Sequence, residues 1–214
     1  MSFEHLREIY KAELSDAQFA RLGTLIMRET GIKMPPIKKV MVQARLKKRL
    51  RVLDMSSFDD YVNFVFSPEG QASEVIHIFD AVSTNKTDFF REPVHFDFLK
   101  GQVLPEFLEK SNGGLLKVWS AACSSGEEPY TLGITINEFM RQHGGFDFMV
   151  HGTDISTLIL KMANNGIFTH ERVSPAVPDE LLRRYFMRSK DDTKKTYRVV
   201  PELRQKMRFS RLNF

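Results

Sequence analysis

The sequence predicts an α/β protein in which an N-terminal helical bundle precedes a Rossmann-like domain. Residues 1–82 carry helical patterns of apolar side chains, whereas the apolar runs 115–119 and 146–152 are short enough to be buried strands. Each run is followed by a helical pattern, and the order strand, helix, strand, helix implies parallel strands joined by right-handed crossovers. We therefore expect a helical domain at residues 1–82 and an α/β domain at residues 83–214.

Capping and stop signals delimit the helices of the first region. Ser15 is suited to be an N-cap because Gln18 stands three residues later, and Gly31 is suited to end the same helix. Ser56 is expected to cap a further helix, which the Ser-Pro-Glu-Gly run at residues 67–70 breaks. The last helix of this region has an apolar face formed by Val75, Ile78, Phe79 and Val82.

The helix predicted at residues 37–53 is amphipathic and strongly basic. Its apolar face comprises Val42, Leu46, Leu50 and Leu53. Seven of the fourteen residues from 38 to 51 are Lys or Arg, and Arg45, Lys48 and Arg51 fall on the other face. Such a face can simply be solvated, or it can be a docking surface for an acidic partner. The charge pattern alone leaves both interpretations open.

The second domain begins with a polar loop at residues 84–91 and continues through two short helices to the first strand. A turn of small residues, 121–126, follows that strand. The next helix is expected to start at Pro129, because proline is tolerated in a first turn. The second strand leads into Asp154, and Ser156 can cap the helix after it.

The remainder of the chain has one further helical pattern and two patterns typical of strands. Residues 178–186 have a helical pattern, and the polar run 189–195 is typical of a turn. Residues 196–200 and 206–212 are expected to be strands.

The turn at residues 121–126 and the acids near it indicate a ligand without a pyrophosphate. The turn contains one glycine, so it lacks the three-glycine fingerprint of dinucleotide-binding enzymes and the Lys-Ser/Thr pair of P-loop proteins. Glu127 and Glu128 can meet a cationic group, and Asp154 ends a strand where doubly wound folds hold ribose hydroxyls. The structural alternatives are that both glutamates stabilise a helix as first-turn acids and that Asp154 caps the next helix.

Composition disfavours several classes of protein. The one cysteine of the 214 residues, Cys123, rules out an internal disulfide and argues against structural zinc, so we expect no metal. No apolar run approaches the roughly 20 residues of a membrane helix, and the charged N-terminus is no signal peptide; we expect a cytoplasmic protein without membrane insertion. A net charge of +4 is a weak footprint of nucleic-acid binding, and we expect no such partner.

Several multi-residue motifs in the right order resemble the CheR-type chemotaxis receptor methyltransferases. They occupy residues 85–92, 119–122, 126–130, 153–156 and 184–186. The similarity covers nearly the whole chain. It implies a Rossmann-like methyltransferase domain that uses S-adenosylmethionine to methylate glutamate side chains of bacterial chemoreceptors in chemotaxis adaptation. The products would be glutamate methyl esters and S-adenosylhomocysteine.

The resemblance also implies roles for individual residues. Arg91 matches the family's active-site arginine and is expected to orient the acceptor carboxylate by a two-point contact. No general base is expected, because a glutamate is already ionised at neutral pH. The expected cofactor contacts are Asn85, Thr87, Arg91, Ala122, Glu127, Glu128, Asp154, Asn213 and Phe214. The expected partners are cytoplasmic helices of methyl-accepting chemoreceptors, docked on Arg45, Lys48 and Arg51.

The family pattern extends past the Ser-Arg-Leu-Asn-Phe stretch at residues 210–214, so we expect the methyltransferase domain to be incomplete in this sequence. One alternative is a non-catalytic adaptor or sensor that retains the cofactor fold. Another is a nucleic-acid-binding module built on the basic helix, which lacks interleaved aromatic residues for stacking on bases. The resemblance also implies a small antiparallel β subdomain at residues 172–206, and the sequence does not decide whether this subdomain binds a receptor tail.

Overall fold

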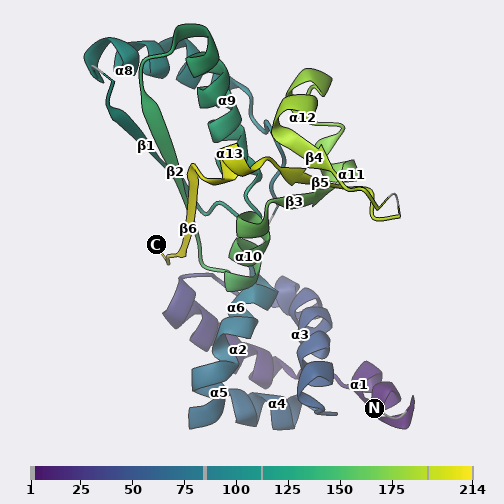
Figure 1. Ribbon diagram of the computed structural model, residues 1–214. Helices are drawn as coiled ribbons and strands as arrows, with labels where there is room; N and C mark the ends of the chain where they lie inside the picture. Colours follow the sequence, from purple (N-terminus) through teal and green to yellow (C-terminus); the bar gives the residue numbers. More distant parts are fainter. Residues whose placement is uncertain (1–2, 84–85, 112, 192, 214) are drawn as a thin grey trace. The chain divides into compact units, whose positions relative to one another are not determined.

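The computed structural model describes residues 3–83, 86–111, 113–191 and 193–213 (Figure 1). The chain forms two compact units, one of residues 1–84 with 213–214 and one of residues 85–212. The described part of the first unit is helical, and the second unit combines a parallel sheet, a small antiparallel sheet and helices. The predicted fold class is confirmed. In the part of the chain that is described, no helix combines the length and the apolarity needed to cross a membrane.

The first unit packs short helices around one apolar core that includes Leu22 and Leu46. In chain order they are α1 (Phe3–Lys11), α2 (Asp16–Thr30), the 3-10 turn η1 (Pro36–Lys38), α3 (Lys39–Leu53), α4 (Phe58–Val65), α5 (Pro68–Ser73) and α6 (Val75–Val82). The caps predicted for α2 are confirmed. Ser15 and Gln18 form a reciprocal capping box, and Gly31 ends the helix with a φ of 71°.

The N-cap expected for α4 is wrong, and the expectation for residues 67–70 is correct but incomplete. The N-cap of α4 is Ser57, whose Oγ accepts the N–H of Asp60 at 3.1 Å, and not Ser56. Both serines stand three residues before an aspartate, so the sequence pattern does not distinguish them. The run at residues 67–70 does more than end α4, because Ser67 caps α5 and a proline takes its first position.

The cations of α3 are held largely by the protein itself. Arg45 is half-buried, and its Nη1 donates to the carbonyls of Ala81 and Ser83 at 2.9 and 3.0 Å, where α6 ends. Arg51 is half-buried beside a tyrosine ring of α1, whereas Lys48 is exposed. The expectation that all three cations share an exposed face is wrong. Long arginine side chains lie along neighbouring helices when carbonyls or rings are within reach there.

The second unit is built on a parallel sheet with the order β1-β2-β6 (Figure 1). Its elements are α7 (Val94–Phe98), the π-helical turn η2 (Leu99–Val103), α8 (Leu104–Ser111), β1 (Leu115–Ala121), α9 (Glu127–His143), β2 (Asp147–Asp154), α10 (Thr157–Asn165) and, later in the chain, β6 (Met207–Arg211). α9 and α10 pack against β2 and β6, where Phe148, Val150 and Met207 are buried. The predicted strand and helix order and the parallel pairing are confirmed.

α9 starts at Glu127, two residues before the predicted start at Pro129. Both glutamates of the acid pair therefore lie in its first turn. The N-cap is Gly126, with a φ of 97°, and a Cβ at this position would lie 3.0 Å from the Cβ of Ala163 in α10. Both the turn and the close approach of the two helices thus require glycine.

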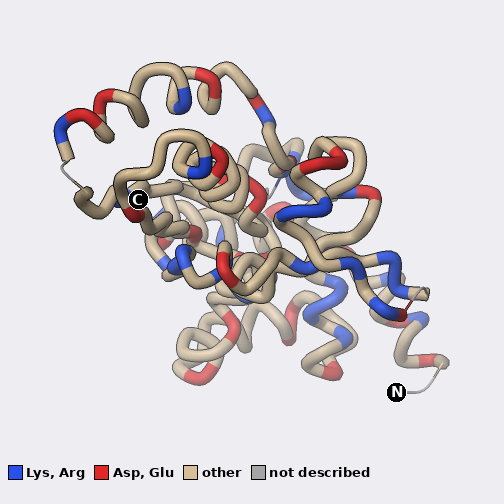
Figure 2. The backbone as a smooth tube through the Cα atoms, turned by 45° about the horizontal axis from the view of Figure 1, so that its top comes forward, with Lys and Arg blue, Asp and Glu red and all other residues tan. Residues whose placement is uncertain are grey.

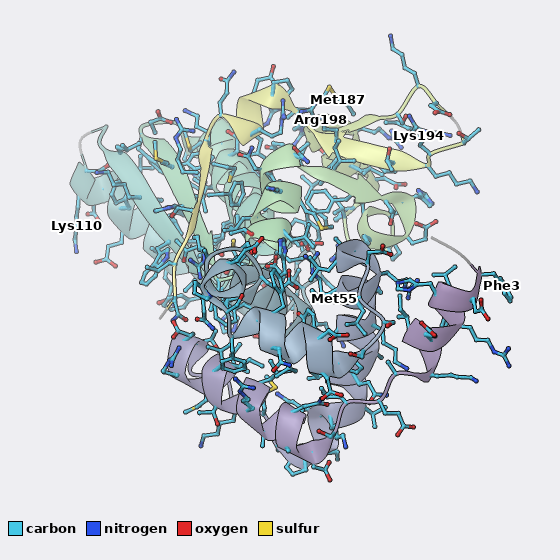
Figure 3. The ribbon with its side chains drawn as sticks, turned by 90° about the horizontal axis from the view of Figure 1, so that it is seen from below. Phe3, Met55, Lys110, Met187, Lys194 and Arg198 are labelled. Atoms are coloured by element: carbon cyan, nitrogen blue, oxygen red, sulfur yellow. The ribbon has the colours of Figure 1, made fainter. Side chains whose placement is uncertain are left out.

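A small antiparallel sheet with the order β3-β5-β4 lies between α10 and β6 in the chain. Its elements are β3 (Ile167–Thr169), α11 (His170–Val173), α12 (Asp179–Tyr185), β4 (Phe186–Arg188), β5 (Thr196–Val199) and α13 (Pro201–Arg204). Met187 and Arg198 are register partners and lie next to each other in Figure 3. The first strand precedes residue 172, where the subdomain was expected to begin, because three residues are too few to give a strand pattern.

Candidate functional site

The carboxyl ends of β1 and β2 lie side by side, and the candidate site is at this edge. Ala121, the last residue of β1, pairs in register with Thr153, the residue before Asp154. The chain leaving β1 is held against β2 by a hydrogen bond from the Cys123 N–H to the Thr153 carbonyl at 2.8 Å. Ligands of open parallel sheets bind outside the carboxyl ends of the strands.

Asp154 ties together the two chain segments that leave the sheet. Its side chain is 5% exposed; Oδ2 accepts the N–H of Ser124, and Oδ1 accepts the N–H of Ser156, each at 2.9 Å. The side chain that caps α10 is Ser156, as predicted, so capping does not depend on Asp154 alone. Each carboxylate oxygen retains a further lone pair, and the backbone holds the group ready to accept a hydroxyl.

The loops at this edge have an uncommon backbone conformation. Ala122 and Ser124 have φ values of 56° and 51°, and Phe90 and Glu92 have values of 53° and 55°. Of the six non-glycine residues with positive φ in the described chain, these four lie in the two loops. Such conformations cost of order 1–3 kcal/mol each and cluster at ligand sites. Ala122 is also exposed, so its small side chain leaves the backbone of this turn approachable.

The structure separates the two glutamates that the sequence treats as a pair. Glu128 is exposed, and its Oε1 accepts a hydrogen bond from Ser120 Oγ at 2.7 Å. Glu127 is 1% exposed and faces Arg172 and Ser125. Burial raises the pKa of Glu127 above its usual value, and the Ser125 hydroxyl and the Arg172 charge oppose that rise. Of the pair, Glu128 is the one accessible to a cationic ligand group.

The polar loop ahead of α7 is anchored by Phe89. Phe89 is buried, with its ring centroid 4.9 Å from that of Phe168 and 5.5 Å from that of Phe186 in the small sheet. Arg91 is exposed, and its Nη1 donates to the carbonyl of Lys86 at 3.0 Å. The anchored loop therefore presents an arginine whose other N–H groups are available to a carboxylate.

Cys123 is a turn residue rather than a nucleophile. It is 2% exposed, and burial, reinforced by the nearby Asp154 charge, raises the pKa of its thiol to about 12. A thiol in this state is inert at neutral pH. Among the described residues, no group of three or more His, Cys, Asp or Glu side chains could hold a metal ion.

The other residues predicted to contact the cofactor differ in how the structure places them relative to the carboxyl ends of β1 and β2. Thr87 is half-buried in the polar loop, and its carbonyl accepts from Arg172 Nη2 at 3.4 Å. Asn213 is exposed and groups with the helical unit, so its contact with a cofactor stays a prediction. Asn85 and Phe214 lie outside the described residues.

Sequence reasoning missed two residues that hold the site together, Arg172 and Thr131. Thr131 Oγ1 donates to the carbonyl of Glu127 at 2.7 Å and accepts the N–H of Phe90 at 3.2 Å. Arg172 meets its acceptors across 45 to 85 residues of chain. Neither residue belongs to a local motif that could have marked it, since the contacts exist only after the chain folds.

Family models match almost the whole chain. The model described as the CheR methyltransferase all-alpha domain matches residues 17–83, and that of the CheR methyltransferase SAM-binding domain matches residues 85–214.

Named relatives agree with these matches. A chemotaxis protein methyltransferase of Borreliella burgdorferi is 35% identical over 201 residues, which are 92% of this chain and 69% of the relative. Chemotaxis protein methyltransferases of Klebsiella aerogenes and Escherichia coli are each 36% identical over 200 residues, or 94% of this chain and 66% and 67% of theirs. The chain thus spans about two thirds of the length of these relatives.

Proposed function

This chain belongs to the CheR methyltransferase family, with S-adenosylmethionine as its cofactor, and we propose that it methylates glutamate side chains of bacterial chemoreceptors. One observation carries the proposal. Asp154 is the last residue of β2, Glu128 in the first turn of α9 is hydrogen-bonded to Ser120 of β1, and the loop between β1 and α9 is small and strained. Carboxylates at this edge suit a ligand that carries an ammonium group and ribose hydroxyls but no phosphate.

The cofactor contacts divide by their accessibility. We assign Asp154 to the ribose hydroxyls, because its oxygens are fixed by two N–H groups and still have acceptor capacity. Glu128, exposed beside Ser120, is assigned to the ammonium group. Ala122, exposed in the turn after β1, and Thr87, half-buried in the polar loop, are assigned further cofactor contacts. Glu127 is assigned an indirect role, since it is buried.

The reaction needs alignment rather than proton transfer. When bound, S-adenosylmethionine supplies a methyl group activated by a positive sulfur. The acceptor glutamate, with an ordinary pKa near 4.3, is already a carboxylate at neutral pH, so an oxygen lone pair forms the new bond to carbon while the carbon–sulfur bond breaks and its electrons stay on sulfur. Arg91 is assigned to hold the acceptor carboxylate in line, and alignment of this kind can supply roughly 7–11 kcal/mol in favourable cases.

Receptor recognition is assigned to the cations of α3, with Lys48 as the leading contact. Arg45 and Arg51 are assigned to the same surface. Before it can bind a receptor, however, Arg45 must break its hydrogen bonds to two carbonyls, and Arg51 must leave the ring of Tyr10. Cations and anions are interspersed along the chain (Figure 2), so a local cluster, rather than the net charge, would have to select an acidic helix. We place the reaction in the cytoplasm, where the proposed receptor helices would be reached.

The test separates cofactor binding from transfer. Asp154→Ala should weaken binding of S-adenosylhomocysteine, measured by calorimetry, by about 1–3 kcal/mol, the usual cost of leaving polar partners unpaired. Arg91→Ala should lower the transfer of a radiolabelled methyl group to a receptor fragment much more than it lowers that affinity. Arg91→Lys should restore little, because an ammonium cannot make the planar two-point contact.

Asp191→Ala, in an exposed turn of the small sheet, is the matched control and should alter neither readout. Unchanged affinity in Asp154→Ala would remove Asp154 from the cofactor site. Wild-type chain that binds the cofactor product but labels no receptor glutamate would contradict the proposed substrate.

A further inference from the structure

Arg172, in α11, contacts three segments of the candidate site at once. Its Nη2 lies 2.5 Å from Oε1 of Glu127, 3.2 Å from Oγ of Ser125 and 3.4 Å from the carbonyl oxygen of Thr87. These acceptors belong to the first turn of α9, to the loop after β1 and to the loop that carries Arg91. A single guanidinium nitrogen therefore links three segments that are far apart in sequence.

The contact between Arg172 and Glu127 is not a surface ion pair, because Glu127 is buried. It is 1% exposed, and the arginine side chain is 34% exposed. Glu127 Oε2 accepts from Ser125 Oγ at 2.7 Å, whereas Oε1 has the ion pair with Arg172 but no hydrogen bond of good geometry. An uncompensated buried carboxylate is costly, so removing Arg172 leaves Glu127 either to take up a proton or to move toward water.

The same first turn of α9 also fastens the Arg91 loop by a second route. Thr131 is fully buried, and it connects the carbonyl of Glu127 to the N–H of Phe90. Phe90 and Ser124 both have positive φ values, so each loop needs such contacts to keep a conformation that it would otherwise leave. The position of Glu127 thus affects both loops.

We propose that Arg172 is a positioning residue: by pairing with buried Glu127 while holding Ser125 and Thr87, it fixes both loops for cofactor binding without touching the cofactor. This inference rests on the proposed function, since it takes the edge of β1 and β2 to be the cofactor site. Arginine suits the role because its guanidinium is more weakly hydrated than an ammonium and is therefore favoured in buried ion pairs such as the one with Glu127.

The test uses the 214-residue chain and four variants. Arg172→Met removes the charge and the contacts, and Arg172→Lys keeps the charge. Arg172→Met with Glu127→Gln removes both charges. Arg183→Met, an exposed arginine in α12, is the matched control. For each, calorimetry with S-adenosylhomocysteine gives the affinity, thermal unfolding gives the Tm, and amide exchange without ligand reports on residues 86–91 and 122–126.

Arg172→Met should weaken the affinity roughly tenfold or more, the range of a lost charged hydrogen bond, and should lower the Tm. Arg172→Lys should recover the Tm and only part of the affinity. The double variant separates positioning from stability: without a buried charge its Tm should recover, yet its affinity should stay low and both loops should exchange faster than in wild type.

Recovery of affinity together with the Tm in the double variant would overturn the proposal, because Arg172 would then only neutralise Glu127. Wild-type exchange rates in both loops of Arg172→Met would also overturn it, whether or not any ligand binds. Failure of the wild-type chain to bind S-adenosylhomocysteine counts instead against the proposed function. The loop exchange of the variants still decides whether Arg172 fastens the loops.

Discussion

Glu74 of the helical unit and Glu127 of the second unit are both buried, at 2% and 1% exposure, and each faces an arginine. Glu74 is fully bonded: Arg49 donates to its two oxygens at 2.8 and 2.7 Å, and the Tyr61 hydroxyl donates to Oε1 at 2.9 Å. This two-point geometry, with a third donor, offsets much of the cost of burying the charge.

Glu127 is bonded less completely. It has one hydroxyl donor and one ion pair, and its Oε1 lacks a hydrogen bond of good geometry. Its neighbours are strained loops, whereas the neighbours of Glu74 are regular helices. Burial and an arginine partner therefore do not by themselves mark a functional site. An incompletely bonded acid beside strained loops does mark one, because such a group calls for an explanation other than stability.

The largest expected effect is on the fully bonded pair. Arg49→Met leaves Glu74 buried without a countercharge and should lower the free energy of unfolding by about 3–5 kcal/mol. Urea unfolding followed by circular dichroism measures this loss. Lys48→Met, on the same helix but exposed, should stay within about 0.5 kcal/mol of wild type. A loss below about 1 kcal/mol for Arg49→Met would contradict the stabilising role given to the Arg49–Glu74 pair.

A smaller effect is expected from the titration of Glu127. Burial raises the pKa of this acid, so the folded chain holds its proton to higher pH than the unfolded chain, whose glutamate pKa is near 4.3. The stability contributed by the group therefore falls as pH rises from about 4 through the raised pKa. Glu127→Gln removes the titration, and its stability relative to wild type should increase with pH over this window.

Urea unfolding of both proteins at several pH values from 4 to 7 provides the measurement. A relative stability that instead decreases with pH would show that Ser125 and Arg172 outweigh burial and hold the pKa down. Glu127 would then resemble Glu74, and the comparison between the two acids would fail.

Short-range signals made much of the fold predictable. The capping box of Ser15 and Gln18, the stop at Gly31 and the cap at Ser156 each depend on residues within a few positions of one another. The alternation of apolar runs and helices likewise predicted the parallel sheet. The N-cap of α4 was wrong because Ser57 repeats the pattern of its neighbour, and the interaction that decides between them is not visible in a sequence window.

The candidate site was predictable only in part. Asp154 follows from where a strand ends and Glu128 from its place after the turn of small residues, but nothing local separates a buried Glu127 from an exposed Glu128. Arg172 was missed because its acceptors are 45 to 85 residues away in the sequence and come within reach only in the folded chain. Arg45 was expected to be exposed because its acceptors, 36 and 38 residues away, are carbonyls that become available only when α6 ends beside α3.

The smallest expected effect concerns the exposed cation of α3. Lys48→Glu should change the free energy of unfolding by no more than about 1 kcal/mol, since an exposed charge is worth little. Arg45→Glu is unsuitable for the same purpose, because losing its two carbonyl contacts would destabilise the helical unit. On this helix, replacing the exposed Lys48 therefore tests docking without a large change in stability.

In the proposed reaction, Lys48→Glu should raise the apparent KM for a receptor fragment at low salt, because the reversed charge repels an acidic helix during encounter. The increase should shrink as salt rises, since exposed charges are screened beyond about 8 Å at physiological ionic strength. Lys33→Glu changes the net charge equally at an exposed position outside α3. If that control raises the KM as much, the effect belongs to net charge and α3 is only a solvated helix; if Lys48→Glu leaves the KM unchanged at low salt, the docking role is wrong.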